Sequence, residues 1–79
     1  MSITLDQAKS LKKGTILYHM YDTNYKGAPQ EWHVNGVPRT WKTIPERVRV
    51  PLKHGMYTYG YLTEYELDLV SLTPPQLQA

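Results

Sequence analysis

The sequence predicts a mainly β protein, a small barrel of about five antiparallel strands with a short N-terminal helix and a helical turn before the last strand. Short runs rich in β-branched and aromatic residues alternate between apolar and polar positions. Asn35-Gly36 between two such runs is the strongest short-range signal for a hairpin. Capping-box patterns begin at Thr4 and at Thr63. With 79 residues the chain is one domain with one modest core.

The first element is a short helix over residues 5–12. Thr4 is followed three residues later by Gln7, which is the capping-box pattern. Leu5, Ala8 and Leu11 then recur at helical spacing. Gly14 supplies the stop, and a helix of this length needs packing against the rest of the chain to persist.

A first strand over residues 15–20 (TILYHM) follows, because this run is rich in β-forming residues. Residues 21–29 then predict a long polar loop with two aromatic residues, Tyr21 and Tyr25.

The next element is a hairpin that carries both tryptophans. A two-residue type I′ turn at Asn35-Gly36 fixes the register of the two strands. The pairs that share one face are then Val34 with Val37, Trp32 with Arg39, and Gln30 with Trp41. Pro38 lacks an N–H that would point away from the partner strand, which argues against a third strand pairing there.

Residues 47–52 alternate cleanly, so Val48, Val50 and Leu52 should face inward and Arg47 and Arg49 outward. A turn over residues 53–55 leads to a strand over residues 56–62. This strand places its three tyrosines, at positions 57, 59 and 61, on one face. Glycine 60 within the strand indicates a bulge or a sharp bend.

A second capping box, Thr63 to Glu66, predicts one helical turn, and residues 69–72 form the last short strand. Residues 1–73 then make one domain, and we expect residues 74–79 to be a disordered tail. This order of elements resembles that of an SH3-like barrel. An OB-like barrel ranks second, because the linker over residues 42–46 is too short for the helix that such barrels place there.

Several short patterns resemble those of short open reading frames found in tailed phages and prophages, over about two-thirds of the chain. They are Gly14-Thr15, Tyr18-His19, Pro29, Trp32-x-Val34-Asn35-Gly36, Thr40-Trp41-Lys42, Arg47-x-x-Val50-Pro51-Leu52-Lys53-x-Gly55 and Tyr61-Leu62-Thr63-Glu64. The resemblance implies a phage origin, and therefore the cytoplasm of a host cell, but no particular activity.

The residue types exclude several classes of function. The chain has no cysteine, and its three histidines, at positions 19, 33 and 54, lie on separate elements without metal-ligand spacing. No nucleophile motif and no glycine-rich phosphate loop is present. The acidic residues 64, 66 and 68 suit a helix start better than acid–base catalysis. We therefore expect no enzyme, no cofactor, no metal and no membrane partner.

The net charge of +2 hides an asymmetry. Residues 37–55 contain five cations and one anion, whereas residues 56–79 contain three anions and no Lys or Arg. Such a division steers an anionic partner to one side of the molecule, although scattered solvated charge would look the same.

Cations beside a row of phenol rings favour nucleic acid, because phosphates need charge and bases need flat faces. The candidate binding residues are Arg39, Trp41, Lys42, Arg47, Arg49, Lys53, Tyr57 and Tyr59. Two alternatives stay open at this point. The tyrosines and both tryptophans could instead fill the core. The chain could also be a protein-interaction module or an inhibitor of a host protein, with a groove between the 21–25 loop and the tryptophan hairpin. The oligomeric state is left open.

Overall fold

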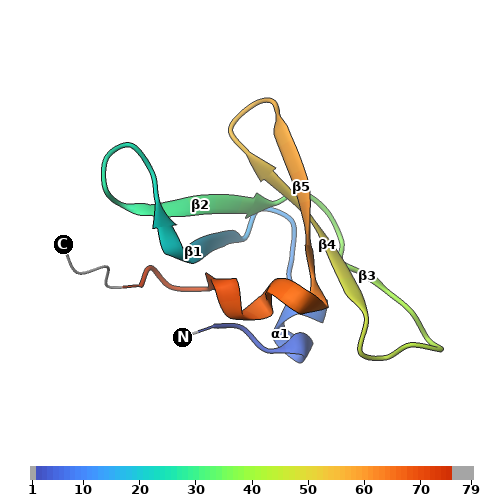
Figure 1. Ribbon diagram of the computed structural model, residues 1–79. Helices are drawn as coiled ribbons and strands as arrows, with labels where there is room; N and C mark the ends of the chain where they lie inside the picture. Colours follow the sequence, from blue (N-terminus) through green and yellow to red (C-terminus); the bar gives the residue numbers. More distant parts are fainter. Residues whose placement is uncertain (1, 76–79) are drawn as a thin grey trace.

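The computed structural model describes residues 2–75 and contains one antiparallel sheet with two short helices (Figure 1). The helices are α1 (Leu5–Lys9) and the 3₁₀ helix η1 (Glu64–Leu69), which contact each other below the sheet. The strands are β1 (Ile16–Thr23), β2 (Pro29–Val34), β3 (Arg39–Thr40), β4 (Val48–His54), β5 (Thr58–Thr63) and β6 (Val70–Ser71). The prediction of a mainly β, antiparallel protein with a small N-terminal helix is confirmed.

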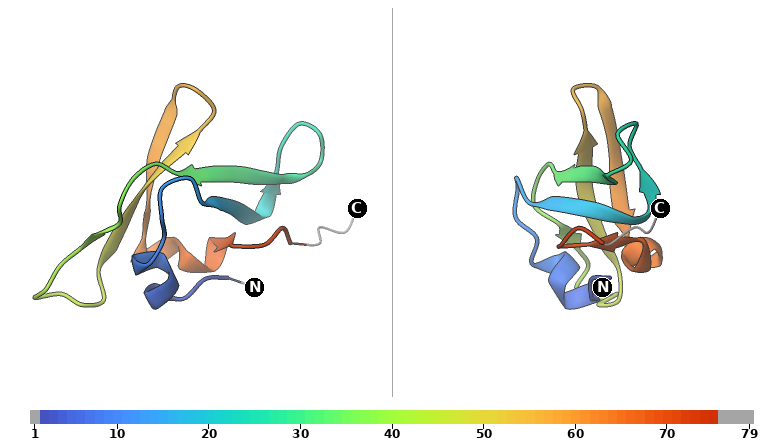
Figure 2. Two further views of the ribbon diagram at one scale, coloured as in Figure 1. Left: turned by 180° about the vertical axis from the view of Figure 1, so that it is seen from behind. Right: turned by 90° about the vertical axis from the view of Figure 1, so that its left-hand side faces the viewer.

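Strand β4 is the centre of the sheet. One of its edges pairs with β5 from Arg49 to His54, and the other pairs with β3 near its start and with β2 near its end. The order continues from β2 to β1 and then to β6. Figure 2 shows that the β4–β5 hairpin stands steeply against the β1–β2 layer, so the sheet is strongly bent. Among the described strands the sheet stays open between β5 and β6, which η1 connects.

The predicted tryptophan hairpin is wrong. Val34 pairs with Leu52 of β4, not with Val37, and no pairing joins β2 to β3. The Asn35 N–H donates to the Pro51 carbonyl over 2.8 Å. Neither Asn35 nor Gly36 has the positive φ that a type I′ turn requires.

Gly36 lies close to the side chain of Pro51 in β4. A Cβ at this position would lie 3.2 Å from Cγ of Pro51. Beyond Gly36 the chain continues along the same edge of β4, in the same direction as β2, and forms the short β3. Burial of Val34 against Leu52, which are 2 % and 6 % exposed, outweighs the local turn preference of Asn-Gly.

The predicted alternation of β4 is confirmed. Val48 and Val50 have no exposed surface, whereas Arg49 between them is exposed. Val48 and Val50 belong to a single hydrophobic core. Its other members are Ile3, Ala8, Leu11, Leu17, Val34, Leu52, Leu62 and Val70. Leu5, Trp32 and Leu67 are half-buried and pack against this core.

Both capping boxes form. The Thr4 N–H donates to Oε1 of Gln7 over 2.8 Å, and the Gln7 N–H donates to Oγ1 of Thr4 over 3.1 Å. At η1 the Glu66 carboxylate accepts from the Thr63 N–H and from the Thr63 hydroxyl, over 3.4 and 3.1 Å. Helix α1 ends at Lys9, three residues before the predicted end at residue 12.

Several details of the strands differ from the sequence prediction. β1 continues to Thr23 through a register irregularity after Tyr18, so the polar loop is shorter than residues 21–29. β5 pairs with β4 without a bulge at Gly60, which lies instead against the Trp32 ring. The last strand is limited to two residues. Of the predicted tail, residues 76–79 lie outside the described part of the chain.

Candidate nucleic-acid interface

The outer side of β3, β4 and β5 gathers cations and aromatic rings. Arg39 of β3 lies directly opposite Arg49 of β4, and on the other edge of β4, Lys53 lies opposite Tyr59 of β5. Opposite residues of neighbouring strands project to the same side of a sheet. We call this side the basic-aromatic face and define it by residues Arg39, Trp41, Arg47, Arg49, Lys53, Tyr59, Tyr61 and Tyr65.

Strand β4 sets the spacing of the charges. Outward positions recur every second residue, about 6.8 Å apart along an antiparallel strand. Arg49 and Lys53 occupy two of these positions, Pro51 occupies the one between them, and Arg47 immediately precedes the strand. The cations therefore follow one line along the face.

Two cations of this line rest on tyrosine rings of β5. The guanidinium carbon of Arg49 lies 5.3 Å from the centre of the Tyr61 ring, and Nζ of Lys53 lies 6.0 Å from that of Tyr59. The tyrosines are 61 % and 62 % exposed, so they do not fill the core. A cation lies over one face of each ring, and most of each tyrosine remains exposed to solvent.

The two tryptophans lie in different places. Trp41 is half-buried on the basic-aromatic face, where the guanidinium carbons of Arg39 and Arg47 lie 4.9 and 5.4 Å from its ring centre. Trp32 packs against the core and against the ring of His54, at a centroid distance of 5.3 Å. The predicted pairing of Trp32 with Arg39 is therefore wrong, and the arginine packs on the other tryptophan.

None of the cations of this face forms a salt bridge within residues 2–75. The two ion pairs of that part of the chain each join a histidine to a carboxylate, His19 to Asp22 and His33 to Glu31. Like charges directly opposite one another destabilise a strand pair. The Arg39–Arg49 pair is therefore a place where a bound anion would relieve repulsion.

One carboxylate borders the face at its lower end. Oε1 of Glu64 accepts a hydrogen bond from the Val48 N–H over 3.1 Å. Hydrogen bonds from the backbone N–H groups of Glu64 and Val48 lower the pKa of this carboxyl below its ordinary value, and the charges of Arg47 and Arg49 add to the effect. Glu64 is therefore ionised at neutral pH.

Glu64 also lines a surface hollow of about 260 Å³ at this end of the face, together with Trp41, Arg47, Arg49 and Tyr65. The hollow joins aromatic rings, guanidinium groups and one ionised carboxylate.

Six of the eight predicted binding residues lie on the basic-aromatic face. Lys42 is exposed in the bend after β3, and Tyr57 is 87 % exposed in the turn between β4 and β5, so these two lie at its margins. The residues predicted to bind did not include Tyr61, although it lies two residues from Tyr59 and therefore on the same face of the strand. Sequence reasoning also missed Tyr65 and Glu64, because the acidic residues near position 64 were assigned to helix capping, a role that Glu66 performs.

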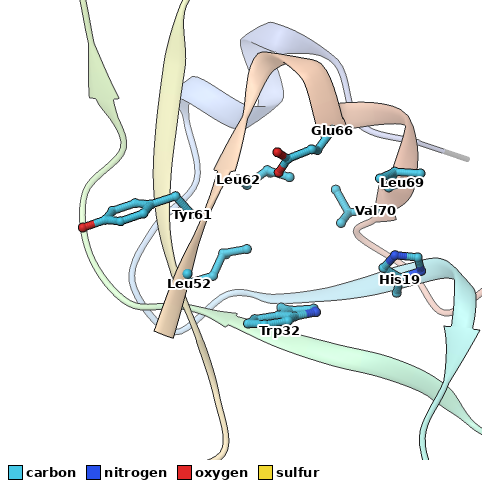
Figure 3. A pocket seen from close by; sticks show the side chains of 9 residues that line it. His19, Trp32, Leu52, Tyr61, Leu62, Glu66, Leu69 and Val70 are labelled. Atoms are coloured by element: carbon cyan, nitrogen blue, oxygen red, sulfur yellow. The ribbon is translucent and has the colours of Figure 1, made fainter. Parts of the chain in front are cut away.

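A second hollow, of about 210 Å³, lies on the inner side of the bent sheet (Figure 3). Trp32, Leu52, Leu62, Leu69 and Val70 make its lining mainly apolar. Figure 3 shows the Tyr61 hydroxyl directed away from it, toward the outer side. A hollow of about 330 Å³ lies between Asn24 and Tyr25 of the predicted loop and residues of β2, but the tryptophan hairpin predicted as the other wall of the groove is absent.

His19, at the rim of this hollow, stabilises the irregular part of β1. Its Nδ1 accepts from the N–H groups of Tyr21 and Asp22, over 3.1 and 2.9 Å. Within residues 2–75, no group of three or more histidine, cysteine or acidic side chains is arranged to hold a metal ion. None of the helices formed by these residues has the length and apolar character needed to cross a membrane.

Comparisons with protein-family models, with curated proteins and with solved structures found no match to this chain.

Proposed function

We propose that this protein is a small non-enzymatic binding module that holds single-stranded nucleic acid on the basic-aromatic face. The observation that carries the proposal is the cross-strand pair Arg39–Arg49, two exposed like charges beside the half-buried ring of Trp41 and the exposed ring of Tyr61. In the described part of the chain no carboxylate forms an ion pair with either guanidinium. A phosphate group between them would supply the missing counter-charge.

The rest of the face suits a single strand. Cations along β4 can follow a phosphate backbone, while Tyr59 and Tyr61 offer ring faces to the bases. Base–aromatic stacking contributes about 1–3 kcal/mol per base in such proteins and tolerates any base. The bases of a duplex are stacked on each other and cannot use these rings, so single strands should bind more tightly.

The finer fold assignment and the biological setting belong to the same proposal. The tight β4–β5 hairpin, followed by η1 and a short final strand, supports an SH3-like barrel that is open between β5 and β6. If the chain is phage-encoded, as its sequence resemblance implies, its nucleic acid is met in the cytoplasm of the host cell.

Fluorescence anisotropy with labelled oligonucleotides tests the proposal. We expect salt-sensitive binding to single-stranded DNA and RNA, with a log–log slope of about −0.7 per phosphate neutralised. The double variant Arg39→Ala/Arg49→Ala should bind several-fold more weakly and with a shallower slope. Lys12→Ala, a charge change in the exposed segment between α1 and β1, serves as the control and should retain most of the affinity.

Absence of salt-sensitive binding to single- and double-stranded oligonucleotides alike would overturn the proposal. A protein-interaction module would then be the remaining class of function. Its partner should survive nuclease treatment in a pull-down from host lysate.

A further inference from the structure

The hollow at the lower end of the basic-aromatic face has a chemistry that its other positions lack. Beside Trp41 and Tyr65 it contains an ionised carboxylate, that of Glu64. We infer that this hollow receives one base of the bound strand and that Glu64 makes it select guanine. The inference rests on the proposed function and names a specificity-determining residue for it.

The register of the sheet explains why these residues meet. Trp41 and Arg47 each lie one residue beyond the pair Thr40–Val48, and Tyr65 lies two residues beyond Thr63. All three line the same hollow. A base in the hollow would therefore have aromatic and guanidinium planes at its sides and a cation near its phosphate.

Glu64 is held in a fixed position within this hollow. Its Oε1 accepts from the Val48 N–H over 3.1 Å, and its own backbone N–H also bonds to the carboxylate, so two of the four lone-pair sites of the carboxylate remain for a ligand. An ionised carboxylate can only accept hydrogen bonds. The ligand edge that fits it must therefore present donors.

Guanine is the base whose Watson–Crick edge matches a carboxylate. Its N1–H and N2–H₂ groups point the same way, so both can donate to the two carboxylate oxygens, as the parallel donors of arginine do. Adenine and cytosine present one amino group beside a ring nitrogen that accepts, and thymine and uracil present one N–H between two carbonyl oxygens. These acceptors would face a negative charge.

The test compares three oligonucleotides on the unmodified protein. The probes are a labelled single-stranded oligothymidylate and the same strand with one central guanine or one central hypoxanthine, the base of inosine, which lacks the N2 amino group. We expect guanine to increase the affinity about tenfold, the scale of a good bidentate contact to a base, and hypoxanthine to lose most of that gain. The same series in RNA shows whether the sugar matters.

Two variants with the same change in charge locate the effect. Glu64→Gln keeps an amide oxygen to accept from Val48 but loses the second charged acceptor, so the guanine preference should disappear. Glu66→Gln is the matched control, because its carboxylate bonds Thr63 and borders the apolar hollow instead. It should retain the guanine preference. Thermal unfolding followed by circular dichroism verifies that both variants fold.

The outcomes separate the two claims. Equal affinity for the guanine and hypoxanthine strands, or a guanine preference that survives in Glu64→Gln, would overturn the base selectivity and leave strand binding intact. Absence of salt-sensitive binding to every strand would overturn both. The hypoxanthine comparison needs no variant, so it decides the inference even if Glu64→Gln does not fold.

Discussion

Arg39 and Arg49 lie directly opposite one another on β3 and β4, and both side chains are exposed. Like charges in this relationship reduce the stability of the strand pair, by about 0.2–1 kcal/mol on the scale of cross-strand pairs. Their cation–π contacts with Trp41 and Tyr61 offset part of that cost. A surface that tolerates such repulsion is suited to an anionic ligand.

Replacement of one arginine should therefore lower the affinity for nucleic acid without lowering the stability of the fold. We expect Arg49→Thr to leave the free energy of unfolding unchanged or to raise it by up to about 0.5 kcal/mol, because threonine suits a strand and the repulsion is removed. The affinity for single-stranded oligonucleotides should fall several-fold. Urea unfolding and anisotropy measure the two quantities. A variant that is clearly less stable, yet binds normally, would show that Arg49 is a structural residue.

The exposed tyrosine rings should contribute to binding through stacking. Tyr61→Ala should weaken binding to single strands by about 1–3 kcal/mol, whereas Tyr61→Phe, which keeps the ring, should bind nearly as well as the unmodified protein. Tyr25, 92 % exposed in the loop between β1 and β2, provides the control variant Tyr25→Ala. If both alanine variants behave alike in anisotropy titrations, the stacking role assigned to Tyr61 is wrong.

Glu64 should make stability depend on pH on the acid side. Its pKa in the folded protein lies below the ordinary value of 4.5, so its ionised form favours the folded state. That contribution is complete above the unfolded-state pKa and is lost as the pH falls through the folded-state pKa. We expect the free energy of unfolding to decrease less between about pH 7 and about pH 3 in Glu64→Gln than in the unmodified protein. Equal losses in urea titrations at the two pH values would contradict the assignment.

Glycine substitutions should show which turn reverses the chain. Gly55 has a φ of +68°, so Gly55→Ala should cost about 1–2 kcal/mol of stability. Gly36 lacks positive φ, and its added Cβ would meet only the Pro51 side chain, at 3.2 Å. Gly36→Ala should therefore cost less, and Pro51→Ala should remove most of that cost in the double variant. Thermal unfolding of the four proteins provides the comparison. If Gly36→Ala lost more stability than Gly55→Ala, the result would support the Asn35-Gly36 hairpin predicted from the sequence.

Local signals predicted the local structure well. The alternation of Val48, Arg49 and Val50 placed each residue on the correct side of β4, and the Thr4 and Thr63 patterns located both helix starts. These signals depend on periodicity and on hydrogen bonds within a few residues, which a single sequence contains.

Pairing between distant segments was the part that the sequence could not provide. Asn35-Gly36 has a strong local preference, yet β2 pairs with β4, where His33 meets Lys53 twenty residues further along. Burial of core side chains across that distance outweighs a turn preference, and no local pattern reports it. For the same reason Arg39 was paired with Trp32, whereas in the structure it packs on Trp41. Glu64 was missed because its role depends on Val48, sixteen residues away.

β4 is hydrogen-bonded to β2 and β3 on one edge and to β5 on the other. The strands of the proposed ligand surface are therefore β4 itself, which contributes core residues, and its direct neighbours. Fraying of the chain ends therefore leaves this surface intact. The surface is lost only when β4 separates from its neighbouring strands. The amides of β4 should accordingly exchange with deuterium only through global opening of the molecule, and a ligand held there would stabilise the whole protein against unfolding.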